Sequence, residues 1–259
     1  MTEKKIWRYH EGRKREEVID SVTIEAPLTI YLNGEELITL LCTPKKTDRL
    51  ALGFLRSEGL ISALNDVSSL RVDEKKGLVE IELKNDKVLA GKLFGRRMIT
   101  SGCGKGTVFY NALDSVLGSP VTGKLQITPE QVRLLMDELQ SKGDLFRLTG
   151  GTHIAAMAEC RRLLITFEDI GRHNALDKII GESLLQGITA EDKIIVSSGR
   201  ISSEILLKAA KLKIQLLISR AAPTSLSVNL AEKLNITLIG FVRGKRFNVY
   251  THEWRISED

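Results

Sequence analysis

A cysteine in a glycine-rich segment is the residue of this sequence best suited to nucleophilic chemistry. Cys103 lies in the run Ser101–Thr107 (SGCGKGT), between two glycines that let the backbone bend and let another molecule approach the sulfur. Lys105, Arg96 and Arg97 add positive charge nearby in the sequence, which favours the thiolate over the thiol. The same charge would stabilise an anionic persulfide. We therefore expect Cys103 to be a functional nucleophile on a mobile loop.

Other readings of this segment have less support. A loop cysteine without function remains an alternative, but cysteine is usually buried and is unexpected in a polar loop. Lys105 is followed by Gly106 and not by Ser or Thr, so the segment is not a Walker loop. Thr107 stands where a dinucleotide fingerprint needs its third glycine. The sequence has no Cys-x-x-Cys pair, so we expect no metal site.

A second candidate site is the polar run Asp169–Lys178 (DIGRHNALDK), at the start of an expected helix. Amide groups at a helix N-terminus favour anions, and Arg172 can bind a phosphate through two hydrogen bonds. His173 and Asn174 can recognise the edge of a base or a pterin. The alternative is a capped helix whose first turn faces water. His153, after the glycines of another turn, could donate a hydrogen bond or a proton near the same ligand.

Arginine recurs in turns that follow expected strands. Four arginines stand at the ends of expected strands in this way: Arg172, Arg200, Arg220 and Arg243. The last of them belongs to the run Phe241–Arg246. If the strands are parallel, these turns converge on one edge of the sheet. Such an edge would suit a ligand rich in phosphate.

The apolar pattern predicts a strand-rich N-terminal part and a C-terminal part in which strands and helices alternate. The expected strands are 20–25, 28–32, 37–42, 69–73, 78–83, 153–159, 163–168, 193–197, 214–218, 237–242 and 246–250. The expected helices are 47–57, one beginning after Thr128, 174–185, 202–212 and 225–234. Alternation of this kind indicates a sheet covered by helices, with ligands near the strand ends.

Composition limits the class of protein. The 259 residues suffice for one large domain or two modest ones. The sequence contains no run of about 18 apolar residues, the length that a membrane-spanning helix needs. The polar N-terminus and three scattered cysteines predict a cytoplasmic protein, with Cys42 and Cys160 in the core. The net charge of +5 favours an anionic ligand. Because basic residues are spread along the chain and aromatic residues are few, we do not expect nucleic acid.

Taken together, these motifs resemble the FdhD family of formate dehydrogenase accessory sulfurtransferases (FdhD/NarQ). The likeness runs from about residue 31 to residue 250, and several distinct motifs occur in the family's order. The stretches that carry it are Gly150–His153, Asp169–Lys178, Ser198–Ser202, Ala222–Thr224 and Phe241–Gly244.

The resemblance implies a fold and an assembly. It implies an α/β protein whose C-terminal domain, 108–259, is a cytidine deaminase-like three-layer α/β/α domain that binds the cofactor. A smaller strand-rich α+β domain would span 1–98, and the mobile cysteine loop would span 99–107. It also implies a homodimer.

The resemblance further implies a reaction. Cys103 would accept persulfide sulfur from a cysteine desulfurase and pass it to the molybdenum bis(molybdopterin guanine dinucleotide) cofactor, which then enters the catalytic subunit of formate dehydrogenase. GDP would mimic part of this cofactor. The expected cofactor-binding residues are Phe241, Val242, Arg243, Gly244, Lys245 and Arg246 from the resemblance, and Arg172, His173, Arg200 and Arg220 from the chemistry above.

One departure from the family keeps alternatives open. The family loop often reads Cys-x-x-Cys, whereas here Gly106 replaces the second cysteine. A lone thiolate can still accept and release sulfur by exchange, but a cofactor-binding chaperone without sulfur chemistry is the alternative. A nucleotide hydrolase or deaminase is a third hypothesis; zinc deamination is disfavoured because the motif beginning at His153 lacks its glutamate.

Overall fold

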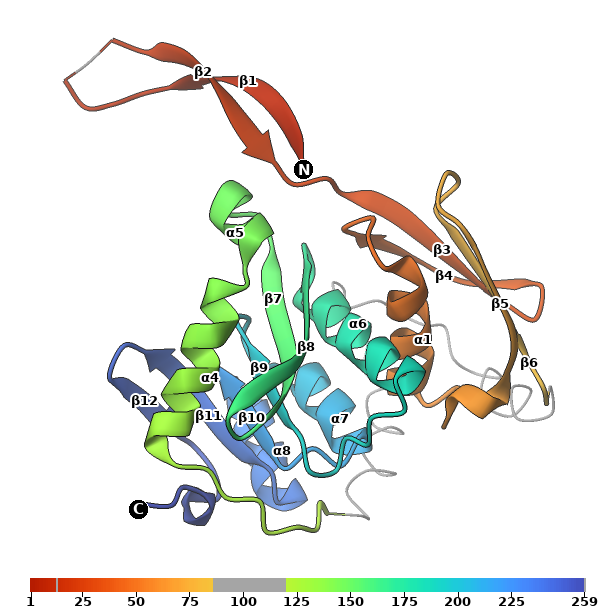
Figure 1. Ribbon diagram of the computed structural model, residues 1–259, viewed down its shortest axis with the longest axis vertical. Coiled ribbons are helices and arrows are strands. Elements are labelled where there is room, and N and C mark those ends of the chain that lie inside the picture. Colours follow the sequence, from red (N-terminus) through yellow and green to blue (C-terminus); the bar gives the residue numbers. More distant parts are fainter. Residues whose placement is uncertain (13, 86–119, 259) are drawn as a thin grey trace.

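The computed structural model describes residues 1–12, 14–85 and 120–258, which form two packed units and an extended arm (Figure 1). The N-terminal unit is a four-stranded sheet of strand order β4-β3-β6-β5 with helix α1 packed on it. Its elements are β3 (Ala26–Leu32), β4 (Glu35–Cys42), α1 (Thr47–Glu58), a 3-10 turn (Leu64–Asp66), β5 (Val67–Asp73) and β6 (Leu78–Leu83).

Local sequence explains how the N-terminal unit forms. Asn33 and Gly34 both have positive φ, of 50° and 80°, as a type I′ hairpin turn requires, and β3 pairs antiparallel with β4. Helix α1 ends at Gly59, whose φ of 78° lets its N–H bond back to the last turn. The predicted hairpin and helix are therefore confirmed.

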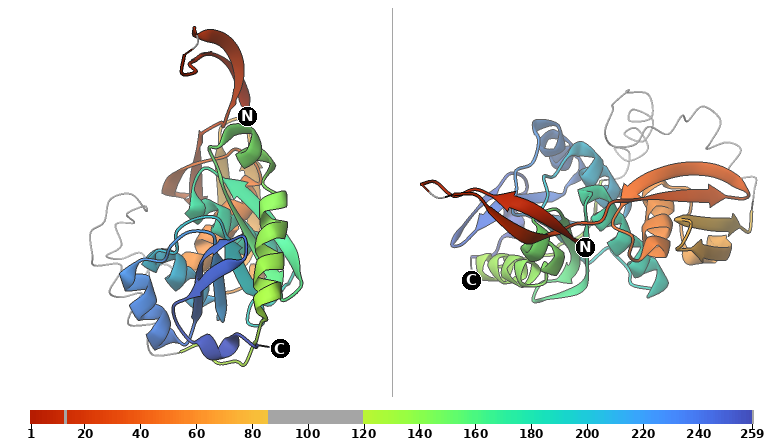
Figure 2. Two further views of the ribbon diagram at one scale, coloured as in Figure 1. Left: turned by 90° about the vertical axis from the view of Figure 1, so that its left-hand side faces the viewer. Right: turned by 90° about the horizontal axis from the view of Figure 1, so that it is seen from above.

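The arm is a two-stranded ribbon of β1 (Thr2–Arg8) and β2 (Glu16–Val22) that extends away from both units (Figures 1 and 2). The predicted strand at 20–25 is present only in part, because β2 ends at Val22 and β3 begins at Ala26. Most of the ribbon is exposed to solvent and none of its residues is fully buried, so its sequence lacks the regular alternation by which a strand is recognised.

The C-terminal unit is built on a six-stranded sheet of strand order β12-β11-β10-β9-β7-β8. The strands are β7 (His153–Glu159), β8 (Arg162–Asp169), β9 (Ile194–Ser197), β10 (Leu216–Ser219), β11 (Thr237–Arg243) and β12 (Arg246–Val249). Strands β9, β10 and β11 pair in parallel, and β8 has the same direction because β7 is antiparallel to both β8 and β9. Four carboxyl ends therefore lie at one edge.

Helices cover both faces of this sheet. Helix α4 (Pro129–Ser141) buries its apolar side on one face, and α6 (Arg172–Leu185), α7 (Ser203–Lys211) and α8 (Ser225–Leu234) pack on the other (Figure 2). The expected three-layer α/β/α arrangement is confirmed; its likeness to cytidine deaminase stays a prediction. The short helix α5 (Asp144–Thr149) follows α4 and was not predicted.

The two units meet where α1 crosses α6. A Cβ atom on Gly53 would lie 1.7 Å from the Asp177 carbonyl oxygen, and one on Gly181 would lie 1.9 Å from the Arg49 carbonyl oxygen. No side chain fits at either position, so the two helix backbones are in direct contact. The expected boundaries at 98/99 and 107/108 lie outside the described residues. Among the helices that are described, none has the length and apolar character needed to cross a membrane.

Candidate functional site

The predicted arginine-bearing turns converge along one edge of the C-terminal sheet. Each follows the carboxyl end of a parallel strand: Arg172 after β8, Arg200 after β9 and Arg220 after β10, while Arg243 ends β11. Strand β7 begins at the same edge with His153. We call Arg172, Arg200, Arg220 and Arg243 the cation rim. Its convergence confirms the conditional prediction, because the strands concerned are parallel.

Hydrogen bonds between neighbouring turns hold the cation rim together. The Arg220 N–H donates to the Ser197 carbonyl oxygen at 3.1 Å, and the Ser219 hydroxyl donates to the Gly199 carbonyl oxygen at 2.7 Å. The Arg243 Nε donates to the Arg220 carbonyl oxygen at 3.3 Å. These contacts fix the spacing between three of the four turns.

Arg172 lies against the turn after β9 from the other side. A Cβ on Gly199 would approach the Arg172 Cβ to 2.9 Å and the His153 Nδ1 to 3.5 Å, so only glycine allows the three groups this close. The Nε of Arg172 is buried without a hydrogen-bond partner among the described residues. Burial first, and then the positive charges of Arg172 and Arg200, lower the pKa of His153. The lowered pKa favours the neutral ring at pH 7, in which one nitrogen can donate a hydrogen bond and the other can accept one.

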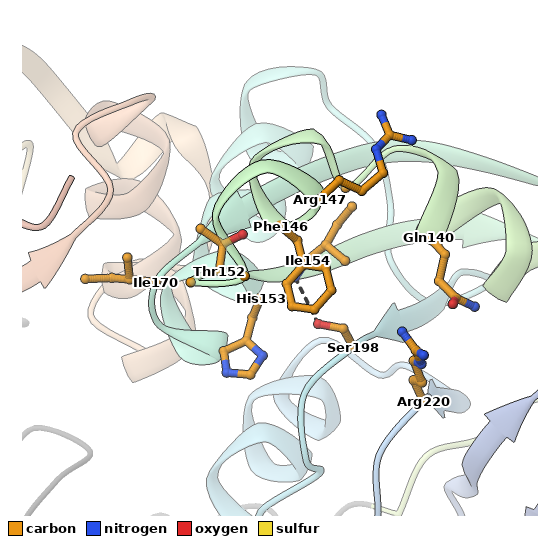
Figure 3. A pocket seen from close by; sticks show the side chains of 12 residues that line it. Gln140, Phe146, Arg147, Thr152, His153, Ile154, Ile170, Ser198 and Arg220 are labelled. Atoms are coloured by element: carbon orange, nitrogen blue, oxygen red, sulfur yellow. Dashed lines mark hydrogen bonds between the residues drawn. The ribbon is translucent and has the colours of Figure 1, made fainter. Parts of the chain in front are cut away.

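A cavity of about 470 Å³ opens beside the cation rim (Figure 3). It lies between the α4–α5 segment and the strand ends, and this size suits a small-molecule ligand. Its lining residues include Gln140, Phe146, Arg147, His153, Ser198 and Arg220. Arg220 thus links the cavity to the cation rim, and the Phe146 ring offers an apolar surface within it.

The segment Phe241–Arg246 forms the turn between β11 and β12. Phe241 has φ of 53°, unusual for a residue with a large side chain, at a bulge in the pairing of the two strands. The Arg243 guanidinium lies 5.6 Å from the centroid of the Phe241 ring. The side chains of Arg243, Lys245 and Arg246 are exposed, whereas Val242 is buried in the core.

Comparison with known proteins agrees with the resemblance. The model of the FdhD/NarQ family matches residues 23–257. This chain belongs to the FdhD/NarQ family. It is 46% identical over 253 residues to the sulfur carrier protein FdhD of Bacillus subtilis, covering 98% of this chain and 96% of that one. The protein of the same name from Bacillus pumilus is also 46% identical, over 256 residues, with the same coverage.

A solved structure supports the fold of this FdhD/NarQ member. The crystal structure of a candidate formate dehydrogenase accessory protein from Desulfotalea psychrophila superposes with a TM-score of 0.80. The two sequences are 25% identical, and the match covers 99% of each chain. The arrangement of both units is therefore shared with the Desulfotalea psychrophila protein.

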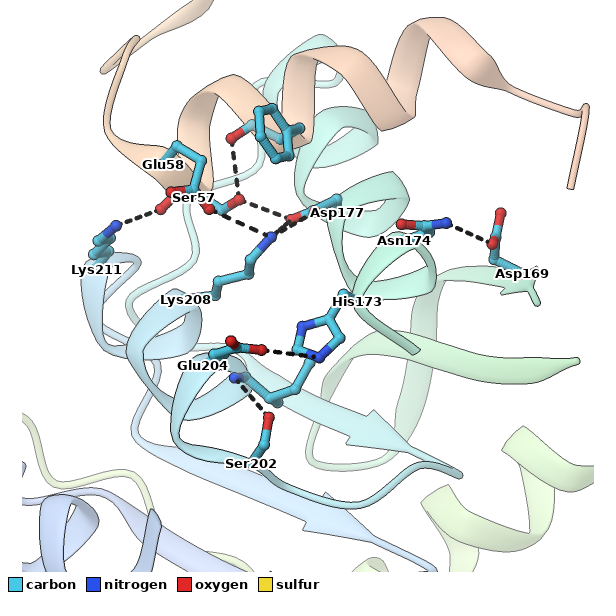
Figure 4. Close-up of polar contacts among 12 residues, drawn as sticks. Ser57, Glu58, Asp169, His173, Asn174, Asp177, Ser202, Glu204, Lys208 and Lys211 are labelled. Atoms are coloured by element: carbon cyan, nitrogen blue, oxygen red, sulfur yellow. Dashed lines mark hydrogen bonds and ion pairs between the residues drawn. The ribbon is translucent and has the colours of Figure 1, made fainter. Parts of the chain in front are cut away.

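Most polar residues of the run Asp169–Lys178 are structural in this FdhD/NarQ member. The Asn174 amide donates to the Leu41 carbonyl oxygen and to the Asp169 carboxylate, both at 2.9 Å. The prediction that Asn174 recognises a base edge was wrong, because its donor group is buried and already bonded (Figure 4). Of the residues in this run, Arg172 is the one that belongs to the cation rim.

His173 is buried between α6 and α7, and it does not line the cavity (Figure 4). Its Nε2 lies 3.3 Å from the Glu204 carboxylate but is not aligned for a hydrogen bond. Burial, followed by the charges of Lys208 and Arg172, lowers the pKa of His173 to about 3. The Glu204 side chain is half exposed, so water screens its charge and burial dominates.

We expect acid to destabilise the protein through His173. Its pKa is about 3 in the folded chain and about 6.5 in an unfolded one, so the unfolded state binds the proton first as the pH falls. The free energy of unfolding should decrease by about 2 kcal/mol between pH 7 and pH 5 from this group. Urea unfolding at both pH values measures it. His173→Gln should lose correspondingly less stability; an equal loss in both proteins would contradict the assignment.

Two of the three cysteines are described, and the prediction that both lie in the core is confirmed for Cys42 but only in part for Cys160, which is in the turn after β7. Cys42 is buried, and burial followed by the nearby Asp169 charge raises the pKa of its thiol to about 11. Cys160 is half-buried against the core beneath α4, and burial raises its pKa as well. Neither is a ready nucleophile at pH 7. Cys103 lies outside the described residues.

The sequence did not single out Gln140, Phe146 and Arg147, which line the cavity from α4 and α5. Phe146 and Arg147 lie on a helix that was not predicted. The glycines at 143 and 150, which flank α5, are the one sequence feature that could have indicated a short separate helix there.

Proposed function

We propose that this protein carries sulfur on Cys103 and delivers it to the molybdenum bis(molybdopterin guanine dinucleotide) cofactor of formate dehydrogenase. The observation that carries the proposal is the cation rim beside the cavity, since phosphate groups need several convergent positive charges. The relatives named sulfur carrier proteins support the sulfur chemistry. We regard the protein as a sulfurtransferase of the cytoplasm.

The sulfur step needs no oxidant. The Cys103 thiolate attacks the terminal sulfur of the persulfide on a cysteine desulfurase, and the desulfurase thiolate leaves. One sulfur–sulfur bond forms as another breaks, so Cys103 gains one sulfur at unchanged overall oxidation level. The resulting persulfide would hold this sulfur until the cofactor, as the substrate, binds at the cation rim. The sulfur would then leave with release of the Cys103 thiolate, and the molybdenum of the substrate would supply the two electrons that reduce sulfane sulfur to sulfide.

The described residues have different parts in holding the cofactor. The guanidinium groups of Arg172, Arg200, Arg220 and Arg243 would bind its phosphates, and Lys245 and Arg246 would extend the positive surface. Gly244, whose φ is 55°, allows the turn that presents them. Phe146 would lie against a guanine or pterin ring in the cavity. His173 and Val242 are buried, so they would pack beneath the residues that contact the cofactor.

The proposed partners follow from the two transfers. A cysteine desulfurase supplies the sulfur, the catalytic subunit of formate dehydrogenase receives the cofactor, and the protein itself forms a homodimer. A chaperone that binds the cofactor without carrying sulfur is the second candidate, which the replacement of the second loop cysteine by Gly106 favours.

GDP binding tests the cation rim. Arg220→Ala and Arg243→Ala should each weaken GDP binding by about 1–3 kcal/mol, the value of a hydrogen bond to a charged group. Isothermal titration calorimetry measures the affinities. Arg162→Ala is the matched control, because Arg162 is exposed at the other end of β8 and pairs with Glu159. An unchanged isotherm for either rim variant would reject that contact.

A further inference from the structure

The Asp169 carboxylate is fully buried and accepts four hydrogen bonds. Its Oδ1 accepts from the Gly171 N–H at 3.0 Å and from the Asn174 amide at 2.9 Å. Its Oδ2 accepts from the Lys178 Nζ at 2.6 Å and from the Thr43 N–H at 3.1 Å. Asp169 thus joins the turn between β8 and α6 to a segment of the N-terminal unit.

Three more hydrogen bonds connect the same two segments. The Ile170 N–H donates to the Thr43 hydroxyl at 3.2 Å, and the Lys178 Nζ donates to the Thr43 carbonyl oxygen at 3.1 Å. The Asn174 amide donates to the Leu41 carbonyl oxygen at 2.9 Å. The segment Leu41–Thr43, where β4 ends, is therefore bonded both before and after the start of α6.

The turn held in this way is the one that carries Arg172. Ile170 lines the cavity, and Gly171 precedes Arg172, the first residue of α6. The Arg172 side chain then lies against Gly199, as described above. A shift of the turn would move the Arg172 guanidinium away from the cation rim.

We infer that Asp169, with Lys178, is a positioning residue that uses the segment Leu41–Thr43 of the N-terminal unit to hold Arg172 in the cation rim. Anion binding on the C-terminal unit therefore depends on main-chain groups of the N-terminal unit. This inference rests on the proposed function in one respect, that the cation rim binds a phosphate-bearing ligand.

Thr43 allows the inference to be tested at a distance from the ligand. Thr43→Val keeps the shape of the side chain but removes the oxygen that accepts from Ile170, whereas Thr43→Ser keeps that oxygen. We expect Thr43→Val to weaken GDP binding about fivefold to tenfold, and Thr43→Ser less than about twofold. Calorimetric titration with GDP measures both variants.

A double-mutant cycle separates positioning from general damage. If Thr43 acts through Arg172, Thr43→Val should have no further effect on GDP affinity in the Arg172→Ala protein. In the Arg243→Ala protein the full effect should remain. The same loss of affinity in the Arg172→Ala protein as in the wild type would overturn the inference.

A second measurement needs no ligand and so remains decisive if GDP does not bind. Arg172 is one of the charges that lower the pKa of His153, after burial. Thr43→Val should therefore raise that pKa toward its usual value in an NMR titration of the free protein, and Thr43→Ser should leave it unchanged. Failure of wild-type GDP binding would reject the proposed function alone. An unchanged His153 pKa in folded Thr43→Val would reject the positioning role.

A replacement variant covers the case in which Thr43→Val does not fold. Asn174→Ala removes the hydrogen bonds to the Leu41 carbonyl oxygen and to the Asp169 carboxylate, and it leaves the ion pair of Asp169 with Lys178 in place. The same cycle and the same NMR titration then apply, with the same expected and overturning results.

Discussion

Lys178→Met is expected to lower the free energy of unfolding by about 3–5 kcal/mol, because it leaves the Asp169 carboxylate buried without its counter-charge. The two side chains are 1% and 0% exposed and 2.6 Å apart, so no water can replace the missing ammonium group. The methionine fills a similar volume, and the loss therefore reports the charge and not a cavity. Urea unfolding at pH 7 measures the change.

The control for this result is a lysine in a similar pair at the surface. Lys142 lies 3.0 Å from Glu138, but its side chain is 46% exposed, so Lys142→Met should cost less than about 1 kcal/mol. The double variant Lys178→Met with Asp169→Asn should be more stable than the sum of the single effects predicts. A loss in Lys178→Met as small as in the control would show that the buried pair contributes little.

Cys103→Ala is expected to abolish sulfur acceptance entirely. After incubation with a cysteine desulfurase and cysteine, the wild-type chain should gain one sulfur in intact-protein mass spectrometry, and the variant should gain none. Cells that depend on the variant should have formate dehydrogenase activity no higher than cells without the protein. The reason is chemical: a methyl group cannot attack a sulfane sulfur.

Cys160→Ser is the matched control for this experiment, because Cys160 is the more accessible of the two described cysteines and has a raised pKa. It should accept sulfur as the wild type does. Full formate dehydrogenase activity with Cys103→Ala would favour the chaperone alternative. Loss of sulfur from Cys160→Ser would move the carrier role to that residue.

The sequence predicted the cation rim because the features that create it are local. Arg172, Arg200 and Arg220 each stand between an apolar strand and a helix start, and Arg243 ends the strand β11 before the turn to β12. Strand direction alone brings the ends of these strands together. The start of helix α4 could be predicted from sequence for the same reason, since Thr128 caps the helix and Pro129 begins it. The same kind of evidence gave the Asn33–Gly34 hairpin.

What the sequence could not show depends on partners that are distant along the chain. A polar helix start has the same pattern whether it faces water or another segment, and the segment that covers Asp169 ends 126 residues earlier, at Thr43. The contribution of Phe146 to the cavity depends likewise on how α5 folds back beside the strand ends. In both cases tertiary contacts decide the role of residues whose local pattern is ambiguous.

The crossing of α1 and α6 at Gly53 and Gly181 has a consequence for how any transfer reaction can proceed. Domains that close on a ligand need a flexible junction, whereas here the main chains touch and hydrogen bonds at Leu41–Thr43 fasten the same border. The two units should therefore diffuse and rotate as one rigid body. Reacting groups cannot be brought together by a change in the angle between them.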